Sequence, residues 1–255
     1  MKLLYGYLLW SILAVVGMGP LTHIASVQSG PPGSQYLWLK GNVGLTNVGT
    51  TSVAWADQSG NGHNCTWGAG TASNLTTSSI NSITTLAWLS GGTKSYLTCT
   101  TAALNGQATW TIGVVFEYTG GVYNSTTLWY NPALFADNFG YYGAYVADNG
   151  GTFAIAENYV TIENVATVTG GSLGIPQYMI MQLSGGVLSV SINGGTAATV
   201  ASGTTHTASA NAYVGYSGFV QTTNQYQGQI GEILVYEYAA NVGQIAGYFH
   251  NRWNI

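Results

Sequence analysis

The C-terminal stretch from Tyr226 to Ile255 carries two hydrophobic patterns in succession. From Ile230 to Glu237, β-branched and aromatic residues occur in both sets of alternating positions, which predicts a strand packed along most of its length. The period then becomes helical, with apolar residues at Val242, Ile245, Phe249 and Trp253. Asn241, followed three places later by Gln244, has the form of a capping box. The pattern therefore predicts a buried strand followed by one short helix that packs against the body.

The rest of the chain alternates over short runs, and glycine-containing turns separate them. The turn signals are SGNG before residue 63, NG at Asn105, DNGG at Asp148 and NGG at Asn193. The sequence contains 36 glycines and only 5 prolines. Many short, evenly spaced strands indicate an all-β sandwich. A chain of 255 residues can bury the core of one such domain, so we expect a single β domain.

Segments in the first half of the chain add a family resemblance. They are YLWLKGN at 36–42, WADQSGNGHN at 55–64, and SYLTCTT followed by ATWTIGVVFEY within 95–118. Together with the terminal strand and helix, they resemble the laminin-G-like jelly rolls of the concanavalin A-like lectin/glucanase superfamily. The resemblance covers residues 36–255. It implies a two-sheet antiparallel jelly-roll sandwich with a short C-terminal helix, preceded here by an apolar N-terminal segment.

That N-terminal segment reads MKLLYGYLLWSILAVVGMG over residues 1–19. One lysine followed by an apolar run fits a secretory signal peptide, a membrane anchor or a hydrophobic assembly helix. The nearest small-residue cleavage site, around Ala25, is poor, so we favour a retained assembly or anchoring segment, with a signal peptide as the alternative. We expect residues 1–25 to form this segment, 26–35 a linker and 36–255 the sandwich.

Charge is unusually scarce. Charged residues make up 5% of the chain, against a usual ~25%. This composition is typical of an extracellular or virion protein whose surface is covered by Thr, Ser, Asn and Tyr. The four Lys and Arg residues are too few to neutralise a phosphate backbone, which argues against nucleic acid as a partner.

The turn at 55–64 offers oxygen ligands for Ca²⁺. Asp57 and Asn61 present a carboxylate and an amide, the groups that this hard cation prefers. In calcium-binding members of the resembled family, further acidic residues often come from the last strand. Here Gln229 and Gly231 occupy positions where the resemblance would allow Asp, and only Glu232 remains. The alternative, which we weight more heavily, is that Asp57 closes an Asx turn with nearby backbone amides.

The two cysteines, Cys65 and Cys99, each lie in a short strand-like run. The resembled fold can place these strands side by side, and an even cysteine count in an extracellular protein favours a disulfide. Two separately buried thiols are the alternative. Metal binding is disfavoured, because the chain has no CxxC spacing.

Residues 120–174 are rich in aromatic side chains among glycines, amides and acids. We expect exposed rings that stack on sugars, with polar groups that bind hydroxyls, at Trp129, Tyr130, Tyr141, Tyr142, Tyr145 and Asp148. The alternative is that these tyrosines serve the sandwich surface or a subunit interface, where Tyr offers apolar area with a polar tip.

No motif for catalysis is evident. Superfamily glucanases carry Glu-x-Asp-x-x-Glu on one strand, because retaining chemistry needs two carboxyls about 5–5.5 Å apart, and this array does not occur. The four histidines have no G-x-S-x-G partner motif. We therefore predict no enzymatic activity.

The resemblance implies adhesion and glycan-binding modules of cell surfaces and phage virions. We predict a non-catalytic, surface-exposed structural or adhesion subunit of a virion or extracellular assembly. Its expected partners are copies of itself or other assembly subunits, a host-surface glycan, and a membrane through residues 1–19. The alternative is a secreted, monomeric, lectin-like carbohydrate-binding protein.

Overall fold

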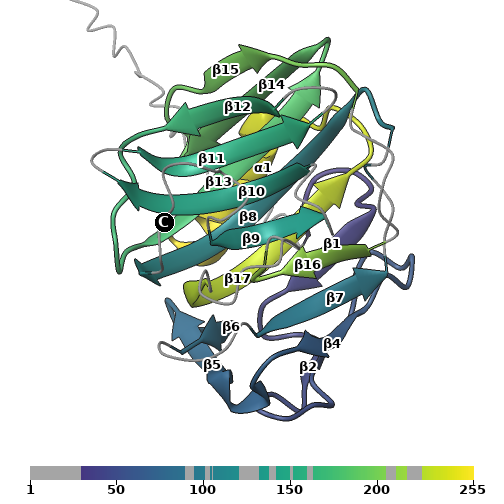
Figure 1. Cartoon of the computed structure of the whole chain (residues 1–255), viewed down its shortest axis with the longest axis vertical. Helices are drawn as coiled ribbons and strands as arrows, with labels where there is room; N and C mark the ends of the chain where they lie inside the picture. Colours follow the sequence, from purple (N-terminus) through teal and green to yellow (C-terminus); the bar gives the residue numbers. More distant parts are fainter. Residues whose placement is uncertain are drawn as a thin grey trace, which may run out of the picture.

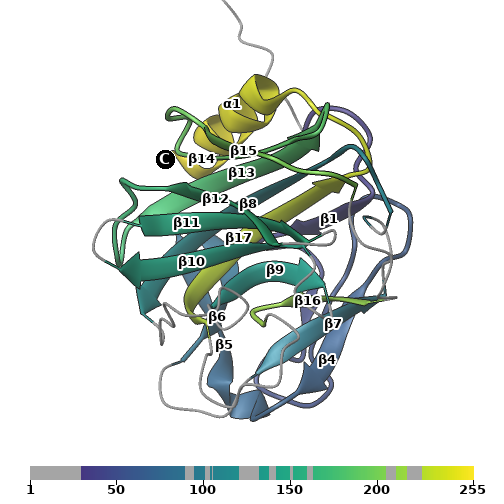
Figure 2. The same cartoon turned by 45° about the horizontal axis from the view of Figure 1, so that its top comes forward.

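The computed structural model describes residues 30–89, 95–100, 104, 106–120, 132–137, 142–149, 152–159, 163–204, 211–216 and 226–255. These residues form two antiparallel β-sheets packed face to face, with one helix on the outside (Figures 1 and 2). The predicted all-β sandwich with a C-terminal helix is confirmed. The predicted segment 1–25 and the first four residues of the predicted linker lie outside the described residues.

The first sheet has the order β15-β14-β13-β8-β17-β6-β5, and β1 also pairs with β17. Its strands are β1 (Leu37–Lys40), β5 (Leu75–Ile80), β6 (Ile83–Trp88), β8 (Trp110–Gly120), β13 (Pro176–Ser184), β14 (Val187–Ile192), β15 (Ala198–Ala201) and β17 (Gln227–Tyr236).

The second sheet has the order β12-β11-β10-β9-β16-β7-β4-β3-β2. Its strands are β2 (Leu45–Thr46), β3 (Ala54–Trp55), β4 (Cys65–Ala69), β7 (Tyr96–Thr100), β9 (Ala133–Asp137), β10 (Tyr142–Asn149), β11 (Thr152–Tyr159), β12 (Glu163–Val168) and β16 (Asn211–Val214). A short 3₁₀ helix, Ala72–Asn74, precedes β5.

β17 is apolar on both faces because both are covered. Ile233 and Val235 belong to the main core between the sheets. Leu234 and Tyr236 belong to a second cluster, which includes buried residues of the helix. Because successive side chains of a strand point to opposite faces, this double burial explains the continuous hydrophobic run in the sequence.

The helix α1 (Val242–Trp253) lies across the outer face of the first sheet (Figure 2). The Asn241 side chain accepts a hydrogen bond from the Gln244 amide at 3.0 Å, so the predicted N-terminal cap is present. The helix ends at Trp253, and the next residue, Asn254, caps it with a φ of 54° in the left-handed region. Its buried residues are Ile245, Tyr248, Phe249 and Trp253. Within the described part of the chain, no helix has the length and apolar character needed to cross a bilayer.

Glycines in the sheet allow the helix to approach closely. A Cβ on Gly231 would lie 2.5 Å from Cη2 of Trp253, and one on Gly113 would lie 2.9 Å from Cε2 of Phe249. Real side-chain atoms do not come this close, so the two rings occupy space that any other residue would fill. The glycines of β17 and β8 therefore set how deeply α1 packs against the sheet.

A buried carboxylate fastens α1 to the sheet. Glu232 on β17 is fully buried, and each of its oxygens accepts two hydrogen bonds. Oε1 accepts from the Trp38 indole at 2.6 Å and the Tyr248 hydroxyl at 2.7 Å. Oε2 accepts from Arg252 Nε at 2.9 Å and the Trp253 indole at 2.7 Å. Burial, followed by the nearby Glu232 charge, raises the pKa of Tyr248 far above its usual range, so its hydroxyl remains a donor.

We expect Glu232→Gln to destabilise the protein by about 3–5 kcal/mol, the usual cost of breaking a buried ion pair. The amide would also place an NH₂ donor against groups that are themselves donors. Urea unfolding at pH 7 measures the change. Glu237→Gln is the matched control, because Glu237 follows the same strand but is exposed, and we expect a change within about 0.5 kcal/mol. A loss below about 1 kcal/mol for Glu232→Gln would contradict the anchoring role.

Candidate functional site

The prediction of an exposed sugar-binding site in the central region is wrong for two of its residues, Tyr142 and Tyr145. Tyr142 and Tyr145 lie on β10, inside the second sheet, and are 1% and 0% exposed. The Tyr142 ring packs in the main core with Trp110, at 6.3 Å between ring centroids. Tyr145 packs in a small cluster with Ala133 and Ala136. Both tyrosines therefore fill the structure and present no ring to a ligand.

The other members of that prediction are not described. Trp129, Tyr130 and Tyr141 lie outside the described residues. Asp148 belongs to β10, but its side chain lies outside the described part. Their predicted role in sugar binding stays a prediction.

The predicted calcium ligands do not converge. Asp57 accepts hydrogen bonds from the Trp38 amide at 2.9 Å, from the Ser59 amide and hydroxyl at 2.9 and 2.7 Å, and from the His63 amide at 3.0 Å. Asp57 thus closes the turn, as the alternative reading expected. Glu232 is bound by one donor from β1 and three from α1, so it is a structural anchor here and not a ligand. Among the described residues, no group of three His, Cys, Asp or Glu side chains could hold a metal ion.

These hydrogen bonds tune the acidity of Asp57. Burial raises the pKa of its carboxyl, but the bonds from the Trp38 amide, the Ser59 hydroxyl and amide and the His63 amide outweigh burial and lower the pKa below its usual value. The turn from Asp57 to His63 is therefore held by an ionised side chain at neutral pH, and its Trp38 bond ties it to β1.

The two cysteines form a disulfide between β4 and β7. Cys65 and Cys99 are directly opposite in the register of these antiparallel strands, with their Cα atoms 4.0 Å apart. Both are fully buried. The bridge therefore ties two strands of the second sheet beside the Asp57 turn, which leads into β4.

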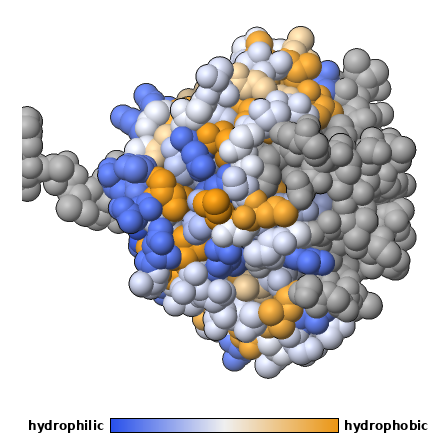
Figure 3. Space-filling view, turned by 90° about the vertical axis from the view of Figure 1, so that its left-hand side faces the viewer, coloured by the Kyte–Doolittle hydropathy of each residue, from blue (hydrophilic) through white to orange (hydrophobic). Residues whose placement is uncertain are grey.

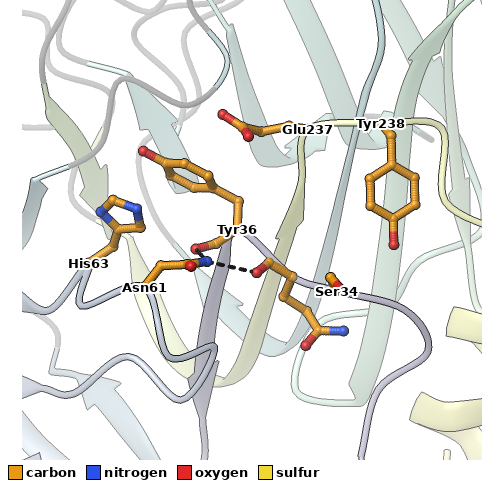
Figure 4. A pocket seen from close by; sticks show the side chains of 7 residues that line it. Ser34, Tyr36, Asn61, His63, Glu237 and Tyr238 are labelled. Atoms are coloured by element: carbon orange, nitrogen blue, oxygen red, sulfur yellow. Dashed lines mark hydrogen bonds between the residues drawn. The ribbon is translucent and has the colours of Figure 1, made fainter.

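An open pocket of about 510 Å³ lies where β1 begins and β17 ends. We call it the β1–β17 pocket; the described residues that line it are Ser34, Gln35, Tyr36, Asn61, His63, Glu237 and Tyr238 (Figure 4). The Tyr36 and His63 rings stack at 4.1 Å between centroids and 18° between planes. In Figure 4 the Glu237 carboxylate lies on the side of these two rings, and Tyr238 stands at the opposite side.

Backbone contacts hold the walls of this pocket together. Tyr36 precedes β1, and its amide donates to the Val235 carbonyl at 2.7 Å, which brings the residues after β17 alongside. The Asn61 side-chain NH₂ donates to the carbonyls of Gln35 at 3.0 Å and Tyr36 at 2.9 Å. His63 Nδ1 bonds the Thr100 carbonyl at 3.0 Å, and because a carbonyl only accepts, this nitrogen carries the hydrogen.

A glycine permits the loop before β1 to pass close to Tyr238. Gly33 has a φ of +71°, and a Cβ there would lie 2.2 Å from the Tyr238 hydroxyl. The Gln35 side-chain amide donates to the carbonyls of Pro32 and Gly33 at 3.0 and 2.5 Å, so the loop is folded on itself. Tyr238 is still 41% exposed, and its ring packs edge-on against Tyr236.

The pocket combines an aromatic wall with a few polar groups, and its volume is within the ~300–1,000 Å³ usual for ligand sites. Aromatic rings beside a carboxylate and amides can stack on apolar ligand faces and bind hydroxyl groups. Sequence reasoning did not single out Tyr36, His63, Glu237 or Tyr238 as site residues. Their positions were the available signal. Tyr36 and His63 lie within the motifs at 36–42 and 55–64, and Glu237 and Tyr238 directly follow the terminal strand.

A second pocket, of about 410 Å³, lies near the ends of β12, β14 and β15. Its described lining is uncharged and includes Thr167, Thr169, Ile192, Thr196 and Ala198. This described lining has no aromatic ring and no carboxylate, so it has fewer groups that could bind a polar ligand. Elsewhere on the surface, polar and apolar residues are interspersed on the face drawn in Figure 3.

No protein-family model matches the chain, and no curated protein matches it. Solved structures share its fold. Domain 4 of AbnA, an extracellular GH43 arabinanase from Geobacillus stearothermophilus solved with arabinotriose, is 13% identical with a TM-score of 0.54, over 76% of this chain and 91% of that domain.

Two longer proteins are also similar. Trypanosoma rangeli sialidase, solved with a difluoro-KDN ligand, is 10% identical with a TM-score of 0.59, over 88% of this chain. The binding domain of botulinum neurotoxin DC, solved with SialylT, is 14% identical with a TM-score of 0.57, over 85% of this chain. The matches span 33% of the sialidase chain and 51% of the toxin chain. At these identities the likeness shows the sandwich fold.

The lowered pKa of Asp57 predicts a pH-dependent contribution to stability. The unfolded carboxyl binds a proton near pH 3.9, and the folded one only at lower pH, so the contribution is complete above about pH 3.9 and is lost as the pH falls through the folded pKa. We expect Asp57→Asn to cost about 1–3 kcal/mol at pH 7, because charge-assisted hydrogen bonds are lost. The difference from the wild type should shrink as the pH is lowered from 5 to 2.

Urea unfolding at each pH measures this difference, with Glu237→Gln as the control that removes an exposed carboxylate and should change little at any pH. A cost for Asp57→Asn that stays constant from pH 7 to pH 2 would show that the charge of Asp57 does not stabilise the turn.

Proposed function

We propose that this chain is a non-catalytic carbohydrate-binding module of the laminin-G-like type, which binds glycan in the β1–β17 pocket. The observation that carries the proposal is the Tyr36–His63 stack beside the Glu237 carboxylate in an open pocket of ligand size. Sugar rings combine apolar faces with many hydroxyls, and this pocket offers a surface for each. Of the two pockets compared above, only this one has aromatic rings and a carboxylate.

The similar structures support a saccharide as the ligand. The arabinanase domain was solved with arabinotriose, and the toxin binding domain was solved with SialylT. At 13% and 14% identity they indicate only what this fold accommodates, so the proposal depends on the pocket itself.

A binding role fits the pocket better than hydrolysis. Glycoside hydrolysis commonly uses two carboxyl groups on opposite sides of the scissile bond. Among the described lining residues, Glu237 supplies one carboxylate, and no second one faces it. Glu117 accepts a hydrogen bond from Gln229 within the first sheet, and Glu232 is enclosed by its four donors.

The proposed setting is the surface of a virion or another extracellular assembly, with copies of this chain or other subunits as neighbours and a host-surface glycan as the ligand. The 5% charge content and the Cys65–Cys99 disulfide support an oxidising, extracellular location. In this proposal, residues 1–25 attach the sandwich to its assembly or to a membrane, and residues 26–35 connect the two.

We expect Tyr238→Ala and His63→Ala each to weaken saccharide binding about tenfold, which corresponds to about 1.4 kcal/mol. Each change removes one ring from the wall of the pocket. A glycan array identifies bound saccharides, and titration calorimetry with the strongest of them gives the affinity. Circular dichroism and the melting temperature check that each variant is folded.

Thr196→Ala, in the second pocket, is the matched control and should bind as the wild type does. Binding that survives both ring deletions but falls in the Thr196 variant would move the site to the second pocket and overturn the proposal.

A further inference from the structure

The charges around the β1–β17 pocket limit which saccharides it can take, if it is the glycan site proposed above. Glu237 is the only Asp, Glu, Lys or Arg among its described lining residues, and it is exposed. A second carboxylate, that of Asp57, does not line the pocket but contacts a lining residue, because it accepts a hydrogen bond from the His63 amide at 3.0 Å. Both acids therefore give the pocket a negative potential, in a chain whose formal net charge is −4.

Among the described residues, no Lys or Arg forms an ion pair with either of these two acids. The Lys40 ammonium instead lies over the Trp38 ring, 4.9 Å from the ring centroid. Arg252 is paired with Glu232 at 2.9 Å beneath the helix. The remaining basic residues, Lys2 and Lys94, lie outside the described residues.

The hydrogen-bonding groups of the pocket also favour a ligand that donates hydrogen bonds. Asn61 uses its side-chain NH₂ on the Gln35 and Tyr36 carbonyls, so its remaining side-chain atom for a ligand is the acceptor Oδ1. His63 uses its Nδ1 hydrogen on Thr100, so in the neutral ring Nε2 is an acceptor. The Glu237 carboxylate only accepts. The Gln35 side chain likewise uses its NH₂ on the Pro32 and Gly33 carbonyls, so among the described lining side chains only the hydroxyls of Ser34, Tyr36 and Tyr238 can take either role.

We infer that the β1–β17 pocket selects saccharides that present hydroxyl donors, and rejects saccharides that carry a carboxylate, such as uronic and sialic acids. A neutral pyranose supplies hydrogens to Glu237, Asn61 and His63, and a bond to an ionised acceptor is the strongest kind. A carboxylate would bring a like charge beside Glu237 and would offer only acceptors to acceptors.

Matched sugars that differ only at C6 test this inference. We would titrate the full chain at pH 7.5 with galactose and galacturonic acid, and with glucose and glucuronic acid, as their methyl glycosides, and repeat each titration with Tyr238→Ala and Glu237→Gln. In the wild type we expect at least one neutral sugar to bind tenfold or more tightly than its acid. Raising the salt from 0.05 to 0.5 M should narrow this ratio, because salt screens the repulsion.

Glu237→Gln should weaken the neutral sugar three- to tenfold and strengthen the acid, so that the ratio falls toward one. Thr196→Ala should leave the ratio unchanged. An acid that binds the wild type as tightly as its neutral partner, with binding lost in Tyr238→Ala, would overturn the inference and leave the pocket as a sugar site. If no sugar binds, or if Tyr238→Ala binds both sugars of a pair as the wild type does, the proposed function fails and the inference fails with it.

Discussion

The packing of this sandwich depends on one buried carboxylate. Glu232 is fully enclosed, and an ionised group in that position is tolerated only if its oxygens are satisfied. One donor comes from β1, through Trp38, and three come from α1, through Tyr248, Arg252 and Trp253. Strand β1, strand β17 and the helix must therefore adopt the arrangement that delivers all four donors. The glycines beneath Trp253 and Phe249 make that arrangement sterically possible.

The same constraint extends to the proposed binding site through Trp38. Its indole donates to Glu232, and its backbone amide donates to Asp57, so one residue joins the helix anchor to the turn that carries Asn61 and His63. Tyr36 lies directly before β1, whose first residue, Leu37, is opposite Val235 of β17, and Glu237 directly follows β17. The pocket walls thus stand at the ends of two strands whose register is fixed, which favours a preformed site.

The sequence predicted those parts of the fold that local patterns determine. The alternation in β17, the helical spacing after it and the Asn241 cap are all readable from neighbouring residues. Function was harder, because Tyr142 and Tyr145 carry the same side chain whether they face solvent or a core, and only their place inside the second sheet decides. The prediction of Glu232 as a metal ligand is wrong. Its actual partners are indole, phenol and guanidinium groups, and no sequence spacing indicates that these groups converge on one carboxylate.

The pocket itself is formed by three segments, 34–36, 61–63 and 237–238, that come together only when β1 pairs with β17 and the Asp57 turn folds over both. No periodicity in the sequence links them.

Mapping a neutral saccharide on the chain by ¹H–¹⁵N and aromatic ¹H–¹³C NMR tests the central claim most directly, because it locates the site without altering it. We predict saturable shift changes concentrated at Tyr36, His63, Glu237 and Tyr238, with none at the second pocket around Thr196. Saturable changes that cluster elsewhere, with the β1–β17 pocket unaffected, would contradict the account.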